Sequence, residues 1–213
     1  KLIKIVDHIN PKAVIHMAAN IEAGESSKKI EKFYNNNVLC TLNLMNAISR
    51  KKIKYIVFSS TAAVYGNTKK TPIKENFRQI PDNVYGSTKL IAEEIIKNYA
   101  NSKKINFCNL RYFNVAGADE DLQIGENHQP ETHLIPLLIE AIIKKKKFNL
   151  YGNNYDTKDG TCLRDFIHVE DLANAHILAL KTIFKKKING AINVGSGSGY
   201  SVKDIINETE KQL

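Results

Sequence analysis

Short apolar runs alternate along this chain with longer segments whose apolar residues recur every three or four positions. Residues 13–19 form a short, continuous apolar run, which predicts a buried β-strand, and residues 54–60 and 105–114 are predicted to form two further strands. The helical spacing predicts amphipathic helices at residues 1–10, 28–50 and 84–100. Strands that are apolar on both faces and alternate with helices are typical of a parallel sheet covered on two sides. The pattern therefore predicts an α/β fold with a doubly wound parallel sheet.

The pattern changes at about residue 118, where Gly, Asn and Asp become frequent. Beyond this point we expect a helix at 133–143 and a short strand at 148–152. The helix after Val169 and the apolar run near residue 191 are expected to return to the main sheet. We therefore expect a sheet domain at residues 1–117 and a smaller mixed region at 118–213, from which residues 170–195 rejoin the sheet.

The composition narrows the class of protein. The 213 residues carry a formal charge of +9, but only four of the 31 basic residues are arginine. The lysine runs alternate with Asn and Ile and follow apolar segments, so we expect solvated faces and helix ends rather than a nucleic-acid surface. No apolar run has the length of a membrane span. The three cysteines lie far apart and match no disulfide or metal-ligand spacing, so we expect a cytoplasmic protein without a metal site.

Three tyrosines stand four positions before a lysine, namely Tyr65, Tyr85 and Tyr99. One helical turn places both side chains of such a pair on one face, but chance alone gives about one pair in a chain this rich in lysine. Tyr65 runs into a turn signal, and Tyr99 lies near a helix end where it suits core packing. Only Tyr85 begins a helix after a strand and a loop, at the carboxyl edge where doubly wound sheets bind ligands. Hydroxyls end the preceding strand at that edge, so we expect Tyr85 and Lys89 to converge with Ser59, Ser60 and Thr61.

The chemistry of a phenol explains why a lysine is needed beside it. At its ordinary pKa of about 10 a phenol is a poor base, and it needs a pKa near 7 to accept a proton efficiently. One positive charge about 6 Å away lowers the pKa of the phenol by roughly two thirds of this difference between 10 and 7. Lys89 together with an oxidised nicotinamide ring would supply the rest. The pattern therefore indicates a proton-transfer tyrosine beside a redox cofactor.

Longer motifs surround these residues: FSSTAAVYG at 58–66, YGSTK at 85–89, RYFNVAGA at 111–118, HLIP at 133–136, LYGNNYDTKDGT at 150–161 and RDFIHVEDLA at 164–173. In sequence, order and spacing they resemble the UDP-glucose (UDP-galactose) 4-epimerases of the extended short-chain dehydrogenase/reductase family. The resemblance covers essentially the whole chain, and its motifs are individually modest but jointly specific.

The resemblance implies interconversion of UDP-glucose and UDP-galactose with NAD as cofactor. The C4 hydride would pass to NAD, and the transient 4-keto sugar would turn over and receive the hydride from enzyme-bound NADH on its other face. Tyr85 would take the proton from the sugar 4-hydroxyl, Thr61 would hydrogen-bond the same oxygen, and Lys89 would bind the nicotinamide ribose. Residues 1–117 would then be part of a Rossmann-like NAD-binding domain without its first βαβ unit, and residues 118–213 would mainly bind substrate.

The same resemblance implies further contacts. Cofactor contacts besides Tyr85 and Lys89 are Met17, Ala18, Ala19, Asn36, Ser59 and Tyr112. Substrate contacts besides Thr61 and Tyr85 are Asn114, His133 and Leu134 near the diphosphate, Asn149 and Tyr151 around uracil, and Arg164, whose planar fork suits a pyrophosphate. Family members often have a lysine where this chain has Ile21, so that contact is not implied. A homodimer through the helices at 28–50 and 84–100 is implied as well.

Other polar residues have plainer explanations. His16 and His168 lie in apolar runs, which predicts core or supporting positions. Asp165 and Asp171 fit caps of loops or helices as well as they fit catalytic groups, so both explanations stay open.

Three alternative functions compete with this one. A nucleotide-sugar 4,6-dehydratase needs acidic groups after the strand hydroxyl, and the methyl groups of Ala62 and Ala63 cannot move protons, so this class is excluded. A UDP-glucuronate or UDP-pentose 4-epimerase stays open, because few pocket residues distinguish it. The third is an inactive fragment. The Gly-rich turn for the NAD pyrophosphate is not in the chain, and we expect about fifty residues or more to be missing before Lys1 and pocket residues to lie beyond Leu213. The 213 residues alone are therefore expected to bind NAD poorly.

Overall fold

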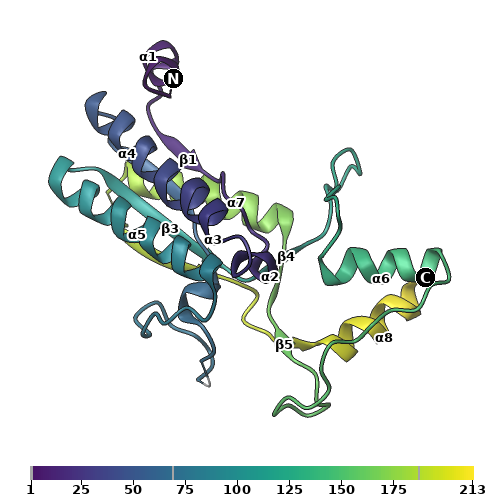
Figure 1. Ribbon diagram of the computed structural model, residues 1–213. Coiled ribbons are helices and arrows are strands. Elements are labelled where there is room, and N and C mark those ends of the chain that lie inside the picture. The colour runs from purple at the N-terminus through teal and green to yellow at the C-terminus, as the bar shows by residue number, and fades with distance from the viewer. Residues whose placement is uncertain (1, 69, 187) are drawn as a thin grey trace. The chain divides into compact units, whose positions relative to one another are not determined.

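A computed structural model describes residues 2–68, 70–186 and 188–213 (Figure 1). The chain forms two compact units. Unit 1 comprises Lys1–Tyr112 and Ala173–Val194, and unit 2 comprises Phe113–Leu172 and Gly195–Leu213.

Unit 1 contains a four-stranded sheet whose neighbouring strands all run parallel. In spatial order the strands are β1 (Val14–His16), β2 (Tyr55–Ser59), β3 (Asn106–Tyr112) and β7 (Gly190–Val194). The late strand β7 pairs with β3 and so lies at one edge of the sheet. The α/β fold with a parallel sheet is confirmed.

One face of the sheet is covered by helices that precede or link its strands. They are α1 (Leu2–Ile9), α4 (Cys40–Arg50) and α5 (Val84–Lys103). Their apolar side chains form one core with Ile56 and Phe58 of β2 and Phe107 of β3.

The opposite face is covered by α7 (Val169–Phe184), whose Ala179 and Ile183 pack against Val57, Cys108 and Leu110. Successive side chains of a strand point to opposite faces, so Val57 faces α7 while its two neighbours face the other core. The sheet is therefore covered on both faces, as a doubly wound architecture requires.

The helix predicted at residues 28–50 consists of several pieces. The chain forms α2 (Ala23–Ser26), α3 (Ile30–Phe33), a π-helical segment η1 (Tyr34–Leu39) and then α4. A π-helical turn takes in one more residue than an α-turn and so rotates the next part of the helix about its axis. The buried Asn37 lies in this segment, and its side chain donates to the backbone carbonyl of Asn20 and to Thr88 Oγ1, both at 3.0 Å. Apolar spacing alone does not reveal such a segment.

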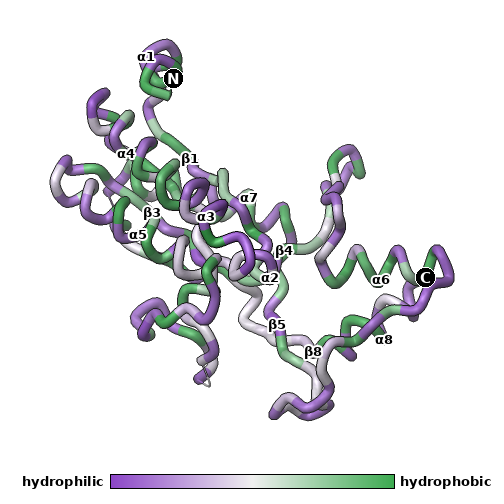
Figure 2. The backbone as a smooth tube through the Cα atoms, viewed as in Figure 1, coloured by the Kyte–Doolittle hydropathy of each residue, from purple (hydrophilic) through white to green (hydrophobic). Residues whose placement is uncertain are grey.

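Unit 2 contains two small sheets and two helices. The parallel pair is β4 (Asn114–Ala116) with β6 (Phe166–His168), and the antiparallel pair is β5 (Leu163–Arg164) with β8 (Tyr200–Ser201). The helices α6 (Leu134–Ile143) and α8 (Val202–Gln212) pack together. Figure 2 colours much of α6 as hydrophobic, in keeping with its sequence LIPLLIEAII.

The strand predicted at residues 148–152 is wrong. The segment is irregular, Tyr151 is 85% exposed, and in the part of the chain that the structure describes it pairs with no strand. A strand needs a hydrogen-bonded neighbour, which an apolar pattern cannot guarantee.

No helix within the described residues combines the length and apolar character that crossing a membrane requires.

Candidate active site

The carboxyl edge of the sheet in unit 1 gathers the catalytic residues that the sequence predicts. Strand β2 ends at Ser59, and the short helix η2 (Ala62–Tyr65) begins directly after Thr61. Helix α5 begins nearby, where Asn83 caps it by accepting the backbone N–H of Gly86 at 2.8 Å. A Cβ atom on Gly86 would lie 2.6 Å from the carbonyl oxygen of Ala63. Glycine is therefore required for the first turn of α5 to lie against η2, and this close approach brings Tyr85 to Thr61.

The hydroxyl of Thr61 lies beside that of Tyr85 and acts on the phenol as a hydrogen-bond partner that lowers its pKa. Thr61 Oγ1 also accepts the backbone N–H of Ala63 at 3.1 Å, so its own proton is available for the phenol oxygen. Burial raises the pKa of Tyr85, and the bond with Thr61 lowers it by less. The lowered pKa that the sequence predicts is thus not produced by the protein groups alone. In this structure Tyr85 is a neutral phenol at pH 7.

Lys89 lies one helical turn after Tyr85 and is 2% exposed. Its Nζ donates to the backbone carbonyl of Ser59 at 2.7 Å and stands 4.8 Å from the centre of the Phe58 ring. Burial lowers the pKa of Lys89 to about 8, and the charge of Glu93 opposes this change. An ammonium has three N–H donors, of which the Ser59 carbonyl takes one.

Ser59 also connects β2 to two ring side chains. Its Oγ lies 2.7 Å from Nε2 of His176 on α7, and it also lies beside the hydroxyl of Tyr112 at the end of β3, whose pKa it lowers. Burial raises the pKa of Tyr112, and the bond to Ser59 lowers it by less. The predicted cofactor residues Ser59 and Tyr112 therefore meet at the same edge as Tyr85.

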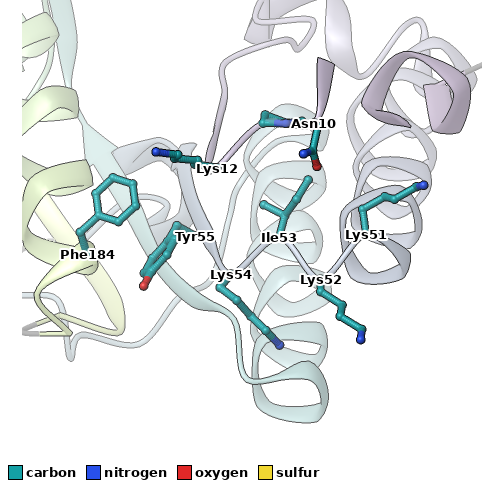
Figure 3. Close-up of a pocket in the computed structure, with 9 residues that line it drawn as sticks. Asn10, Lys12, Lys51, Lys52, Ile53, Lys54, Tyr55 and Phe184 are labelled. Atoms are coloured by element: carbon teal, nitrogen blue, oxygen red, sulfur yellow. The ribbon is translucent and has the colours of Figure 1, made fainter. Parts of the chain in front are cut away.

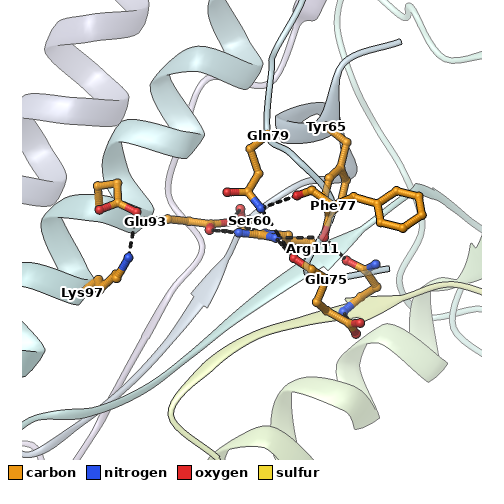
Figure 4. A network of polar contacts seen from close by, with 10 residues as sticks. Ser60, Tyr65, Glu75, Phe77, Gln79, Glu93, Lys97 and Arg111 are labelled. Carbon is orange, nitrogen blue, oxygen red and sulfur yellow. Dashed lines mark hydrogen bonds and ion pairs between the residues drawn. The ribbon is translucent and has the colours of Figure 1, made fainter. Parts of the chain in front are cut away.

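A buried ion pair between Arg111 and Glu93 connects β3 to α5 (Figure 4). Arg111 of β3 donates to Glu93 of α5 through Nη2 at 2.6 Å and through Nε at 2.9 Å, and Ser60 donates to the same carboxylate. Arg111 Nη1 donates to the Tyr65 hydroxyl at 2.8 Å, which donates in turn to Asn193 of β7 at 2.7 Å. The network ties β2, η2, β3 and β7 to α5, the helix that carries Tyr85 and Lys89.

The other two Tyr–Lys pairs of the sequence have structural explanations. Tyr65 is held in the buried network, and Lys69 lies outside the described residues. Tyr99 packs against the core of α4 and α5 and donates to Asn46 at 2.7 Å. These positions agree with the choice of Tyr85, rather than Tyr65 or Tyr99, as the candidate proton-transfer tyrosine.

The remaining cofactor residues follow β1 or lie in η1. Met17, Ala18 and Ala19 come directly after β1, so they lie at the carboxyl edge of the sheet, and Met17 is 60% exposed. Asn36 is exposed, unlike the buried Asn37 beside it.

Two histidines that the sequence assigned to the core differ from each other. His16 is buried, with Nε2 2.9 Å from Thr41 Oγ1, and burial together with the charge of Lys89 lowers its pKa to about 4. Its core position is confirmed. His168 is exposed and only supports a turn, because Nδ1 accepts the backbone N–H of Glu170 at 3.3 Å.

Unit 2 contains six of the predicted substrate contacts. The side chain of Asn114 donates to the backbone carbonyl of Asp165 at 2.9 Å, so this hydrogen bond holds it in the fold. His133 precedes α6 and contacts Glu126, and Leu134 is the first residue of that helix. The others are exposed, namely Asn149, Tyr151 and Arg164.

Asp165 anchors the loop that follows β7. Its carboxylate accepts the backbone N–H groups of Ser196 at 2.8 Å and Gly197 at 3.0 Å. Of the two explanations for Asp165, the loop cap is confirmed.

A hollow of about 440 Å³ lies at the opposite, amino edge of the sheet (Figure 3). It opens beside the first residue of β2, Tyr55, whose ring is 4.4 Å from that of Phe184. Flexible lysines surround it, including Lys12, Lys52 and Lys54. Parallel sheets bind ligands at their carboxyl ends, so this hollow is distinct from the candidate site.

Residues 1–195 match the NAD dependent epimerase/dehydratase family. The chain belongs to this family. It is 45% identical over 212 residues to the UDP-glucose 4-epimerase of Rhizobium meliloti (strain 1021), which covers 99% of this chain and 65% of that protein. The resemblance drawn from the motifs is confirmed.

Solved structures of the family show the same fold. The UDP-glucose 4-epimerase of Brucella ovis, in complex with NAD, has a TM-score of 0.94 at 42% identity, with 99% of this chain and 65% of that chain covered. The enzyme of Bifidobacterium longum, in complex with NAD⁺ and UDP, has a TM-score of 0.90 at 34% identity, with 99% and 64% covered. The chain thus spans about 65% of the length of the first of these relatives.

Sequence reasoning missed two parts of the site. Gly86 stood out only as part of a motif, although the approach to Ala63 requires a glycine there. The pair of Glu93 and Arg111 was not predicted either. Glu93 follows Lys89 by one helical turn, so a second charged residue on the same face of α5 was the available signal.

Proposed function

We propose that the protein interconverts UDP-glucose and UDP-galactose by inverting C4 of the hexose, with NAD as its cofactor. The observation that carries the proposal is the neighbouring pair of Tyr85 and Thr61 hydroxyls at the carboxyl edge of a parallel sheet, with the buried Lys89 one turn further along α5. The identity of 45% to a UDP-glucose 4-epimerase supports the same reaction.

The residues at this edge suit a nicotinamide nucleotide. Lys89 donates to the Ser59 carbonyl, and its two further N–H groups match the hydroxyls of a ribose. Tyr112 presents a partly buried ring at the end of β3. A bound NAD would supply a hydride acceptor and a positive charge.

The roles of the chain's own residues follow from their contacts. Tyr85 would hold and return the proton of the sugar 4-hydroxyl, and Thr61 would keep that oxygen and the phenol in one hydrogen-bonded line. Because burial leaves the Tyr85 pKa raised, the phenol needs further positive charge before it can accept a proton at neutral pH. Lys89 would bind the ribose and contribute a charge that Glu93 helps to maintain.

The remaining assignments are parts of the same proposal. Unit 1 would be the NAD-binding part of the protein and unit 2 the substrate-binding part, with Asn114, His133, Leu134, Asn149, Tyr151 and Arg164 as its contacts. The additional cofactor contacts would be Met17, Ala18, Ala19 and Asn36. The protein would act in the cytoplasm as a homodimer that pairs through α4 and α5.

An isotope experiment tests the reaction. UDP-galactose with deuterium at C4 is incubated in ordinary water with the protein that carries this chain, and the product is followed by NMR. Internal hydride return predicts UDP-glucose that keeps its deuterium at C4. Loss of the label to solvent, or no conversion, would contradict the proposal.

A chimera controls for the length of the chain. The 213 residues replace the matched 212 residues of the Rhizobium meliloti relative, so that the rest of that enzyme is present. We expect this chimera to convert UDP-galactose faster than UDP-glucuronate or a UDP-pentose. A preference for either of the latter would favour the alternative substrate class.

A further inference from the structure

The loop before α6 gathers two histidines and two glutamates. Glu126, His128, Glu131 and His133 each present one ligand atom, and these four atoms lie within 4.8 Å of one another. All four residues belong to unit 2 and stand in the pattern Glu-x-His-x-x-Glu-x-His. The sequence led us to expect no metal site, because only the cysteine spacing was weighed.

Two of the distances are close to those between ligands that share one small ion. Around a tetrahedral zinc with bonds of about 2.05 Å, neighbouring ligand atoms lie about 3.4 Å apart. Glu131 Oε1 lies 3.4 Å from His133 Nδ1 and 3.7 Å from His128 Nδ1. Glu126 already contacts His133 Nδ1. Small side-chain rotations would therefore complete the arrangement.

The backbone holds these side chains in place. The Glu131 carboxylate accepts the backbone N–H groups of Thr132 at 2.7 Å and His133 at 2.8 Å. The carbonyl of His133 accepts the N–H of Leu137, which joins His133 to the first turn of α6. The rings of His128 and His133 stack with their centres 5.3 Å apart. The Glu131 carboxylate and the backbone of His133 are therefore already held in place.

We infer that this cluster binds a divalent transition metal ion, with zinc as the best match. Imidazole and carboxylate together suit zinc, whereas calcium and magnesium prefer oxygen ligands alone. A bound ion would fasten residues 126–131 to the start of α6. It would also make His133 a metal ligand instead of a diphosphate contact. The inference would remove His133 from the proposed substrate contacts, but it does not involve the proposed catalytic residues Tyr85, Thr61 and Lys89.

The alternative explanation of the cluster is a set of histidine–glutamate ion pairs without an ion. The two explanations differ in what happens when a metal is added. Ion pairs alone give no stoichiometric binding, whereas a built site binds one ion per chain and loses it when any ligand is removed.

The test uses the protein that carries this chain, without a histidine tag and with Cys40→Ser, because Cys40 is exposed and a thiolate is itself a metal ligand. Zinc is titrated by calorimetry after treatment with EDTA, and cobalt(II) is titrated by visible absorption. We expect one ion per chain and the intense visible bands of tetrahedral cobalt. Removing even outer partners of a metal weakens binding about 10–100-fold, so His128→Ala and Glu131→Gln should each weaken it at least that much.

The controls are His8→Ala and Glu94→Gln, which lie in unit 1 and should leave zinc binding unchanged. Circular dichroism in EDTA checks that each variant is folded, and His133→Gln replaces any variant that is not. No binding at micromolar zinc, or equal binding by the ligand variants and the parent, would overturn the inference. Neither outcome depends on whether the protein turns over UDP-sugars.

Discussion

The hydroxyl of Tyr85 lies beside that of Thr61 across the gap between the first turn of α5 and the end of β2. The gap is narrow because Gly86 lets α5 approach the carbonyl of Ala63. The direction of the phenol is thus set by backbone packing as well as by the Tyr–Lys spacing.

Gly86→Ala should disturb this approach. The added Cβ would meet the Ala63 carbonyl oxygen at 2.6 Å, and overpacking of this kind costs about 1–3 kcal/mol of unfolding free energy. Turnover should fall because Tyr85 is displaced. Gly24→Ala is the matched control, since nothing lies within 4 Å of its Cβ, and its unfolding free energy should change by less than about 0.5 kcal/mol. Urea denaturation of both variants measures the difference; equal effects would remove Gly86 from this role.

Glu93→Gln should destabilise the fold strongly. It leaves the buried Arg111 charge without its partner, which costs about 3–5 kcal/mol. Glu94→Gln changes the next residue, whose side chain is 54% exposed and pairs with Lys97 at 3.4 Å, and should cost less than about 1 kcal/mol. The midpoints of urea unfolding compare the two. Similar midpoints would show that the buried pair contributes little.

The buried Lys89 should make stability depend on alkaline pH. Its folded-state pKa of about 8 lies below the ordinary lysine value of 10.5, so the unfolded chain holds the proton more tightly between these values. The penalty for burying the charge is complete below pH 8 and fades as the pH rises toward 10.5. Relative to Lys89→Met, which lacks the titration, the parent should gain roughly 2–3 kcal/mol of unfolding free energy between pH 7 and pH 10. A difference that stays constant over this range would contradict the lowered pKa.

Asn36 and Asn37 should respond differently to alanine. Asn37 is buried and bonded to Asn20 and Thr88, so Asn37→Ala should lower the unfolding free energy by about 1–3 kcal/mol. Asn36 is exposed, so Asn36→Ala should leave stability unchanged and weaken NADH binding. NADH fluorescence titration and thermal melting separate the two effects. Unchanged NADH affinity in Asn36→Ala would withdraw that residue from the cofactor contacts.

The sheet and most helices could be predicted because local pattern decides them. Strands β2 and β3 have partner strands on both sides, and α5 has a capping residue and a helical stripe. The run at residues 148–152 has a similar composition but no partner strand among the described residues. Whether an apolar run becomes a strand depends on pairing that its own residues do not encode.

The parts of the site that escaped prediction depend on contacts between distant residues. Glu93 and Arg111 meet because α5 packs across β3, and the π-helical segment exists where Asn37 bonds to Thr88. The raised pKa of Tyr85 also follows from burial, which depends on the packed fold. Motif resemblance gave the candidate catalytic residues but not the balance of burial and charge around them.

The central claim is that Tyr85 transfers the proton of the sugar 4-hydroxyl, and Tyr85→Phe tests it most directly. The change removes one oxygen, and Tyr99→Phe removes the same atom from a tyrosine that donates only to Asn46. We measure UDP-galactose turnover and UDP-glucose affinity in the protein that carries this chain. The account predicts that Tyr85→Phe loses turnover at least about 10²-fold with affinity within a few-fold, while Tyr99→Phe keeps its turnover. Turnover by Tyr85→Phe equal to that of Tyr99→Phe would contradict it.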